Sequence, residues 1–204
     1  MRRRLAMLAA VAAAALAAPL FAGASCVDDI ASARLIGSGR FCILGICLYD
    51  AQLWAPRPPG AFDTPFALSL AYRHDVKGER LVSTGMDEIE RLAPAPLPAT
   101  TLDAWRRDIE RAFTDVSRGD VLCGVYVPER GARFYTNGRL TADVTDPAFA
   151  RAFFSIWLDP RTRAKSLRRW ATMRADSTVS GDGPMYRCRQ RCSTGQFARI
   201  LLDA

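Results

Sequence analysis

Apolar and polar residues alternate with a period of two along residues 66–73. The large side chains from Phe66 to Tyr72 fall on one face, and Arg73 falls with small residues on the other. This contrast predicts a strand whose large side chains pack against a core. The small residues on its other face let neighbouring structure approach closely. Earlier strands, bounded by glycines, are predicted at 32–37, 39–43 and 46–54.

Helical spacing of apolar residues follows in the next part of the chain. Residues 81–92 predict one helix, which ends at a proline-rich segment. Apolar residues between Trp105 and Val116 predict a second helix, capped by Thr101 or Asp103.

The second half of the chain repeats this order of strands and then helices. Asn137-Gly138 predicts a hairpin turn, and Asp146-Pro147 marks the start of a further helix. The remaining strands are predicted at 121–127, 132–136 and 140–144, and a last, basic helix at 163–173. The order predicts an α+β fold, in which an antiparallel β-sheet has helices packed on one side.

The N-terminal residues are typical of an export signal. Three arginines precede an apolar, alanine-rich run at 5–20, and Ala22-Gly23-Ala24 matches a cleavage site of small residues. We therefore predict a periplasmic or secreted protein with a cleaved signal peptide. A lipoprotein modified on Cys26 is the alternative.

The rest of the chain is predicted to form one domain and a tail. The signal peptide would occupy 1–24, the domain 25–175 and a cysteine-containing tail 176–204. Cleavage removes three arginines, so the formal charge of +7 falls to about +4. This mild excess favours an anionic ligand or an anionic membrane surface. The chain lacks the continuous basic stripe of a nucleic-acid-binding protein.

Six cysteines in an exported chain permit up to three disulfides. Cys42 with Cys47, and Cys188 with Cys192, are the two local candidate pairs. Neither has the spacing of a redox motif. A single histidine is too few for a metal site, and the glycines at 37–39 lack the rest of a phosphate-binding loop, so no metal or cofactor is expected.

Four residues are candidates for contact with a ligand. Arg40 follows two glycines at the start of a strand, where the backbone can bend and direct a long side chain into a cavity. A guanidinium group offers a planar fork to a carboxylate or phenolate. Arg73 is a second candidate, and both arginines could equally pair with acids at the surface. Tyr49 and Tyr72 could orient an acidic head group or reach solvent from the core.

Five short signatures occur in a fixed order, and together they resemble one family. They are Gly37-Ser38-Gly39-Arg40, Tyr49-Asp50-Ala51-Gln52-Leu53-Trp54, Tyr72-Arg73, Gly119-Asp120 and Phe153-Phe154-Ser155-Ile156-Trp157-Leu158. Residues 33–173 resemble the bacterial, exported branch of the chalcone-isomerase-like family. The resemblance implies an open-faced β-sandwich, with helices over a long sheet and a cleft between the layers.

The family contains both isomerases and binding proteins. Its enzymes cyclise a chalcone to a flavanone, whereas its fatty-acid-binding members hold a carboxylate with an arginine and a tyrosine; Arg40 resembles that arginine. The enzyme branch carries a tyrosine and an asparagine on the helices after the first strands. This chain has neither between Asp75 and Pro98, and Leu81 and Glu88 stand near those places. Little then remains to organise a transition state.

The resemblance therefore implies a non-catalytic protein, with no catalytic residue assigned. The expected ligand is a hydrophobic small molecule with an acidic head, such as a fatty acid. A peripheral membrane or envelope partner is a further expectation. Two alternatives are an isomerase or lyase acting on an unknown substrate, and an envelope interaction protein whose cleft beneath Trp157 is filled.

Overall fold

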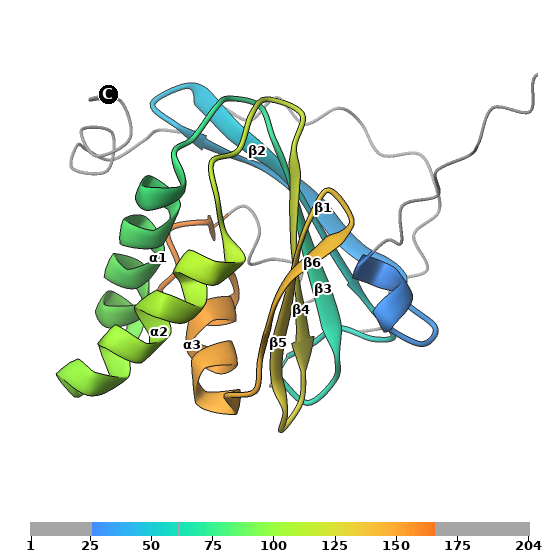
Figure 1. Ribbon diagram of the computed structural model, residues 1–204. Helices are drawn as coiled ribbons and strands as arrows, with labels where there is room; N and C mark the ends of the chain where they lie inside the picture. The colour runs from blue at the N-terminus through green and yellow to red at the C-terminus, as the bar shows by residue number, and fades with distance from the viewer. Residues whose placement is uncertain (1–25, 61, 166–204) are drawn as a thin grey trace, which may run out of the picture.

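Six antiparallel strands form one sheet in the computed structural model, which describes residues 26–60 and 62–165 (Figure 1). Each strand pairs with the next one along the chain. The predicted strands at 32–37 and 39–43 are one strand, which bulges between Leu35 and Gly37. The strands are β1 (Arg34–Ile43), β2 (Ile46–Ala55), β3 (Phe66–Tyr72), β4 (Val121–Val127), β5 (Gly131–Thr136) and β6 (Arg139–Val144).

Three helices cover one face of this sheet (Figure 1). They are α1 (Gly78–Leu92), α2 (Ala99–Ala112) and α3 (Pro147–Leu158). α3 packs on β4 and β5, whereas α1 packs mainly on α2 and α3. The predicted α+β fold, with helices on one side of an antiparallel sheet, is confirmed. No helix in the described part of the chain has the length and apolar character needed to cross a membrane.

The start of α3 follows the sequence prediction, and the start of α2 does not. Asp146 caps α3 by accepting a hydrogen bond from Ala148 N at 2.8 Å. Its other carboxylate oxygen accepts one from Trp105 Nε1 at 2.9 Å, which ties α2 to α3. α2 begins after Pro98, so neither Thr101 nor Asp103 is its cap.

Several sequence predictions concern parts of the chain outside the described residues. They are the signal peptide at 1–24, most of the basic helix at 163–173, and the tail at 176–204 with Cys188 and Cys192.

The N-terminal end of α1 is fixed to the segment that follows α2. Asp115 accepts hydrogen bonds from the backbone N–H of Gly78 at 2.9 Å and from Lys77 Nζ at 2.8 Å. Gly78 lies so close to this segment that an added Cβ would be 2.8 Å from the backbone of Thr114. The position of α1 is therefore set by its contacts with α2 and α3 and by the hydrogen bonds to Asp115. α1 does not lie flat on the strands.

The face of the sheet opposite the helices carries a short 3₁₀ helix, η1 (Cys26–Asp29). A disulfide joins Cys26 to Cys123 on β4, across 97 positions of sequence. A small apolar cluster that includes Ile30 and Val125 surrounds it. A cross-link that closes so long a loop stabilises a domain by roughly 2–5 kcal/mol, because it restricts the unfolded chain.

The β1–β2 hairpin ends in a two-residue turn closed by a second disulfide. Cys42 and Cys47 face each other across the hairpin and are bonded, which is one of the two pairs considered from the sequence. Leu44 and Gly45 form the turn, with φ angles of 48° and 85°. Such turns favour Asn-Gly, because a bulky residue is strained at positive φ. Leu44 is therefore an unfavourable residue for its own backbone position.

Replacement of Leu44 by asparagine should stabilise the protein. Leu44 is 55% exposed, so little packing is lost, and asparagine relieves about 1 kcal/mol of left-handed strain. Urea unfolding of Leu44→Asn beside the wild type measures the difference. A variant less stable than the wild type would contradict the strain at this turn.

Candidate ligand-binding site

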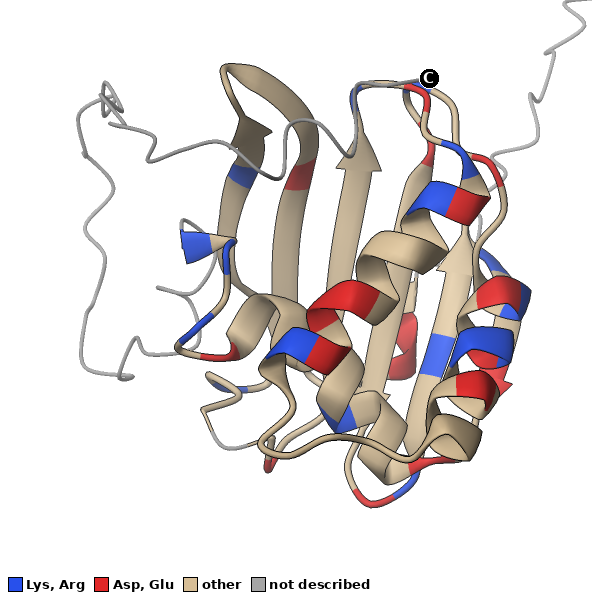
Figure 2. Ribbon diagram, turned by 90° about the vertical axis from the view of Figure 1, so that its left-hand side faces the viewer, with Lys and Arg blue, Asp and Glu red and all other residues tan. Residues whose placement is uncertain are grey.

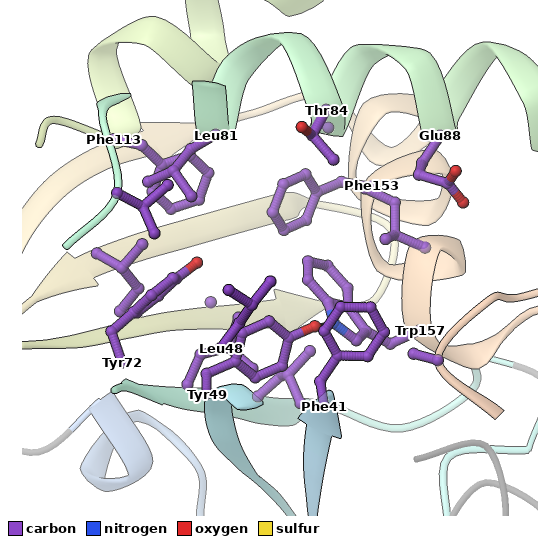
Figure 3. Close-up of a pocket in the computed structure, with 18 of the residues that line it drawn as sticks. Phe41, Leu48, Tyr49, Tyr72, Leu81, Thr84, Glu88, Phe113, Phe153 and Trp157 are labelled. Carbon is purple, nitrogen blue, oxygen red and sulfur yellow. The ribbon is translucent and has the colours of Figure 1, made fainter. Parts of the chain in front are cut away.

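A cavity of about 130 Å³ lies between the sheet and the helices, where α1 stands away from the strands (Figure 3). Its wall is mostly apolar and comes from β1–β4, α1, α3 and the segments that follow α2 and α3. Representative lining residues are Phe41, Leu48, Leu68, Leu81, Phe153 and Trp157.

Strand register places three aromatic rings side by side on the floor of this cavity. Phe41 pairs with Tyr49, and Tyr49 pairs with Tyr72 on the next strand. Residues paired in this way point to the same face of a sheet. The ring centroids lie 5.1 Å apart for Phe41 and Tyr49, and 5.6 Å apart for Tyr49 and Tyr72.

The two tyrosine hydroxyls differ in their hydrogen bonds. Tyr49 accepts a hydrogen bond from Trp157 Nε1 at 3.0 Å, which joins the sheet to α3. Within the described residues the Tyr72 hydroxyl makes no hydrogen bond, and it points into the space between β3 and α1 (Figure 3). Burial raises the pKa of both tyrosines above the ordinary value. Both therefore remain neutral hydrogen-bond donors around neutral pH.

A third hydroxyl in the cavity wall, that of Thr84 on α1, is also without a partner. Its oxygen is buried and makes no hydrogen bond to the described residues. A buried polar atom normally has a partner, since leaving it unpaired costs roughly 1–3 kcal/mol. Tyr72 therefore directs an unused hydroxyl into an apolar cavity, and Thr84 in the same wall has a buried hydroxyl that is also unused.

A buried carboxylate, Glu88, stands at the opposite end of the cavity wall from Leu81 (Figure 3). It accepts hydrogen bonds of 2.6 Å from both Arg91 and Arg163. Arg163 belongs to the segment after α3, so this cluster fixes that segment against the C-terminal half of α1. Two cationic residues, Arg80 and Arg163, contribute to the lining of the cavity.

Arg40 and Arg73, the two arginines considered as ligand contacts, do not line this cavity. Both donate to Asp50, at 2.8 Å and 2.7 Å. Partial burial raises the pKa of Asp50, but the hydrogen bonds from the two guanidinium groups outweigh it and leave the pKa below the ordinary value. Arg40 precedes Phe41 on β1, and neighbours on a strand point to opposite faces. Because Phe41 faces the cavity, Arg40 faces away from it.

Comparison with known proteins identifies the family. A family model described as chalcone isomerase-like matches residues 56–170, more than half of the chain. The chain belongs to the chalcone isomerase-like family. A Haemophilus influenzae protein, described as uncharacterized, is 30% identical over 100 residues. That match covers 49% of this chain and 48% of the relative.

A solved structure in this family fold gives the same architecture. The crystal structure of a fatty-acid-binding protein from Arabidopsis thaliana aligns with a TM-score of 0.56 and 12% identity. The alignment covers 69% of this chain and 86% of that chain. At this level of identity the likeness concerns the fold alone.

Sequence reasoning singled out some of the residues that line the cavity. It proposed Tyr49 and Tyr72, and both line the wall; it noted Leu81 and Glu88, and both line it on α1. It missed Thr84, because a threonine in a helix gives no signal of its own. No group of three or more histidine, cysteine or acidic residues that could hold a metal occurs within 26–60 and 62–165.

The different partners of the two tyrosines predict different effects on stability. Tyr49→Phe should lower the free energy of unfolding by roughly 1–3 kcal/mol, because it leaves the buried Trp157 N–H without an acceptor. Tyr72→Phe should be neutral or slightly stabilising in the ligand-free protein, because the Tyr72 hydroxyl makes no hydrogen bond to the described residues. Urea unfolding of both variants tests this, and equal losses would contradict the assignment.

Proposed function

We propose that this protein binds a hydrophobic small molecule with an acidic head, such as a fatty acid, in the cavity between the sheet and α1. The observation that carries the proposal is an apolar cavity lined by Tyr72 and Thr84, whose hydroxyls make no hydrogen bond to any described residue. Ligand sites of this kind combine an apolar wall with a few polar groups that fix orientation. The fold of a fatty-acid-binding protein supports the same ligand class.

The acidic head would lie near Tyr72, whose hydroxyl would donate a hydrogen bond to it. Thr84 and the cationic residue Arg80 line the cavity from α1. The apolar chain would extend past Phe153 toward Trp157 (Figure 3). The limited cavity volume favours a medium-length chain.

Binding fits the cavity better than catalysis does. The raised pKa values of Tyr49 and Tyr72 make both poor proton donors or acceptors around neutral pH. On α1, Leu81 offers no functional group, and Glu88 is held by Arg91 and Arg163. Turnover of a chalcone-like compound by the purified protein would instead support an isomerase.

We also propose that the protein is exported. The two disulfides, Cys26–Cys123 and Cys42–Cys47, favour an oxidising compartment. The sulfur of Cys26 is used in its disulfide, so it is not free to form the thioether of a lipoprotein. Intact mass spectrometry of the secreted protein should therefore find no acyl groups on Cys26 and a gain of two hydrogens per disulfide on reduction. A lipid mass on Cys26 would overturn this proposal.

Replacement of Tyr72 should weaken ligand binding without a loss of stability. Titration calorimetry with dodecanoic acid as the probe should give about tenfold weaker binding for Tyr72→Phe, the loss of one hydrogen bond to a charged group. Arg40→Ala is the control: its side chain lies outside the cavity, so its affinity should equal that of the wild type. Weaker binding by Arg40→Ala with unchanged binding by Tyr72→Phe would move the site to the other face of the sheet.

A further inference from the structure

The two disulfides in the described part of the chain lie in different surroundings. Cys26 and Cys123 are 6% and 3% exposed and belong to an apolar cluster. Cys42 and Cys47 are both partly exposed in residues 42–47 of the β1–β2 hairpin, which we call the hairpin tip and which Figure 2 shows clear of the three helices. A disulfide is reduced when a thiolate reaches one of its sulfur atoms, so exposure decides which disulfide reacts first. A reductant in solution should therefore react first with Cys42–Cys47.

The Cys42–Cys47 disulfide borders the wall of the ligand cavity. Phe41, next to Cys42 on β1, lines the cavity, and Leu48, which follows the disulfide on β2, lines it as well (Figure 3). The pairing of the two strands skips Leu48, which lies between Cys47 and Tyr49 and has no partner on β1. Such a bulge bends a strand and redirects a side chain. The disulfide thus holds the two strands together directly beside the residues that enter the cavity.

Few other contacts keep the hairpin tip closed. Contact of β2 with the chain after β3 ends at the hydrogen bond from Arg73 N to Leu48 O, at 2.8 Å. Beyond it, in the described part of the chain, β1 and β2 pair only with each other. The turn itself is unfavourable, because Leu44 has a φ of 48°, where asparagine or glycine is preferred. Reduction would leave this turn without its cross-link, so the tip should open more often and carry Phe41 and Leu48 with it.

We propose that Cys42–Cys47 is a reducible site that controls the affinity of the cavity for its ligand. The oxidised tip holds Phe41 and Leu48 in the cavity wall, and the reduced tip lets them leave it. A preformed wall binds more tightly, because no affinity is lost to ordering it. This inference rests on the proposed ligand-binding function. The oxidised protein retains its ligand, and the reduced protein releases it.

The reductant is a dithiol, either a small molecule or a reducing protein. One of its thiolates attacks a sulfur of the Cys42–Cys47 bond to form a mixed disulfide, and its second thiol then displaces the protein sulfur. Two electrons and two protons pass to the protein, so both cysteines become thiols and the dithiol becomes a disulfide. The two cysteines lack the spacing of a catalytic redox motif. The pair is therefore a substrate of reduction and not a reductase.

Limited reduction of the full-length protein with dithiothreitol tests the reducible site. Free thiols are alkylated at intervals and located by peptide mass spectrometry. Cys42 and Cys47 should be labelled about tenfold faster than Cys26 and Cys123, because the second pair is buried. Labelling of Cys26 and Cys123 at the same rate or faster would overturn the site.

Titration calorimetry with dodecanoic acid tests the control of affinity. The variant Cys42→Ser with Cys47→Ser represents the reduced tip and leaves the Cys26–Cys123 disulfide intact. Its affinity should be about tenfold lower than that of the oxidised wild type, as expected if about one molecule in ten has a closed tip. Leu44→Asn added to this variant should restore most of the affinity, because asparagine suits the turn and keeps it closed without a cross-link.

Leu140→Asn is the matched control for this rescue, because Leu140 is also a leucine with 55% exposure but lies on β6. It should restore no affinity to the double serine variant. Equal affinity of the wild type and the double serine variant would overturn the proposal. Equal rescue by the two asparagine substitutions would overturn the role of the turn.

Hydrogen exchange of the ligand-free proteins separates this inference from the proposed function. Backbone amides of residues 41–48 should exchange faster in the double serine variant than in the wild type, and Leu44→Asn should slow them again. Amides of β4 and β5 should be unchanged, which shows that the variant is folded. If the wild type does not bind dodecanoic acid, the proposed function fails, yet faster exchange at 41–48 still supports a tip controlled by its disulfide. Unchanged exchange there would overturn that control.

Discussion

The distance between α1 and the sheet is the constraint on which the rest of the structure depends. α1 packs mainly on α2 and α3, and contacts near its two ends fix it there. At the start of α1, Asp115 accepts a hydrogen bond from the backbone N–H of Gly78. Near the end of α1, Glu88 accepts hydrogen bonds from Arg91 and Arg163. A helix held in this way cannot settle onto the strands and fill the space beneath it. The cavity therefore follows from the packing of the helices, and the ligand site follows from the cavity.

Hydrogen bonding distinguishes the cavity residues that stabilise the fold from those that are available to a ligand. Tyr49 is bonded to Trp157 and joins β2 to α3. Tyr72 lies beside Tyr49 on the next strand, yet its hydroxyl has no partner among the described residues, and neither has Thr84. Free hydroxyls in an apolar wall lower the stability of the empty protein. A bound acidic head would supply the missing partners.

Strand and helix patterns were sufficient to predict the fold. The alternation along 66–73, the Asn137-Gly138 turn and the Asp146-Pro147 cap are local signals, and each has its expected structure. Tyr49 and Tyr72 were considered because a tyrosine hydroxyl can orient an acidic head group, and both line the cavity. Arg40 precedes Phe41, and in a strand one position is the difference between the two faces, so Phe41 lines the cavity and Arg40 does not.

The features that sequence reasoning missed depend on distant contacts. The Cys26–Cys123 disulfide joins segments 97 positions apart, and no local pattern relates them. The free hydroxyl of Thr84 is a property of its surroundings, since the same residue on another helix face would contact water. The turn between β1 and β2 was visible in the sequence as Ile43-Leu44-Gly45-Ile46, but its projection beyond β3 required the register of three strands.

Native mass spectrometry of the full-length protein tests the central claim most directly, that α1 is held above the sheet to leave a ligand cavity. The wild type should be purified beside Leu81→Trp, which fills the cavity, and Leu140→Trp, which adds the same ring at the surface. We expect a small acidic molecule to accompany the wild type and Leu140→Trp, to appear in their organic extracts, and to be absent from Leu81→Trp. A wild type that carries no such molecule, and that added fatty acids do not stabilise against heat, would contradict the account.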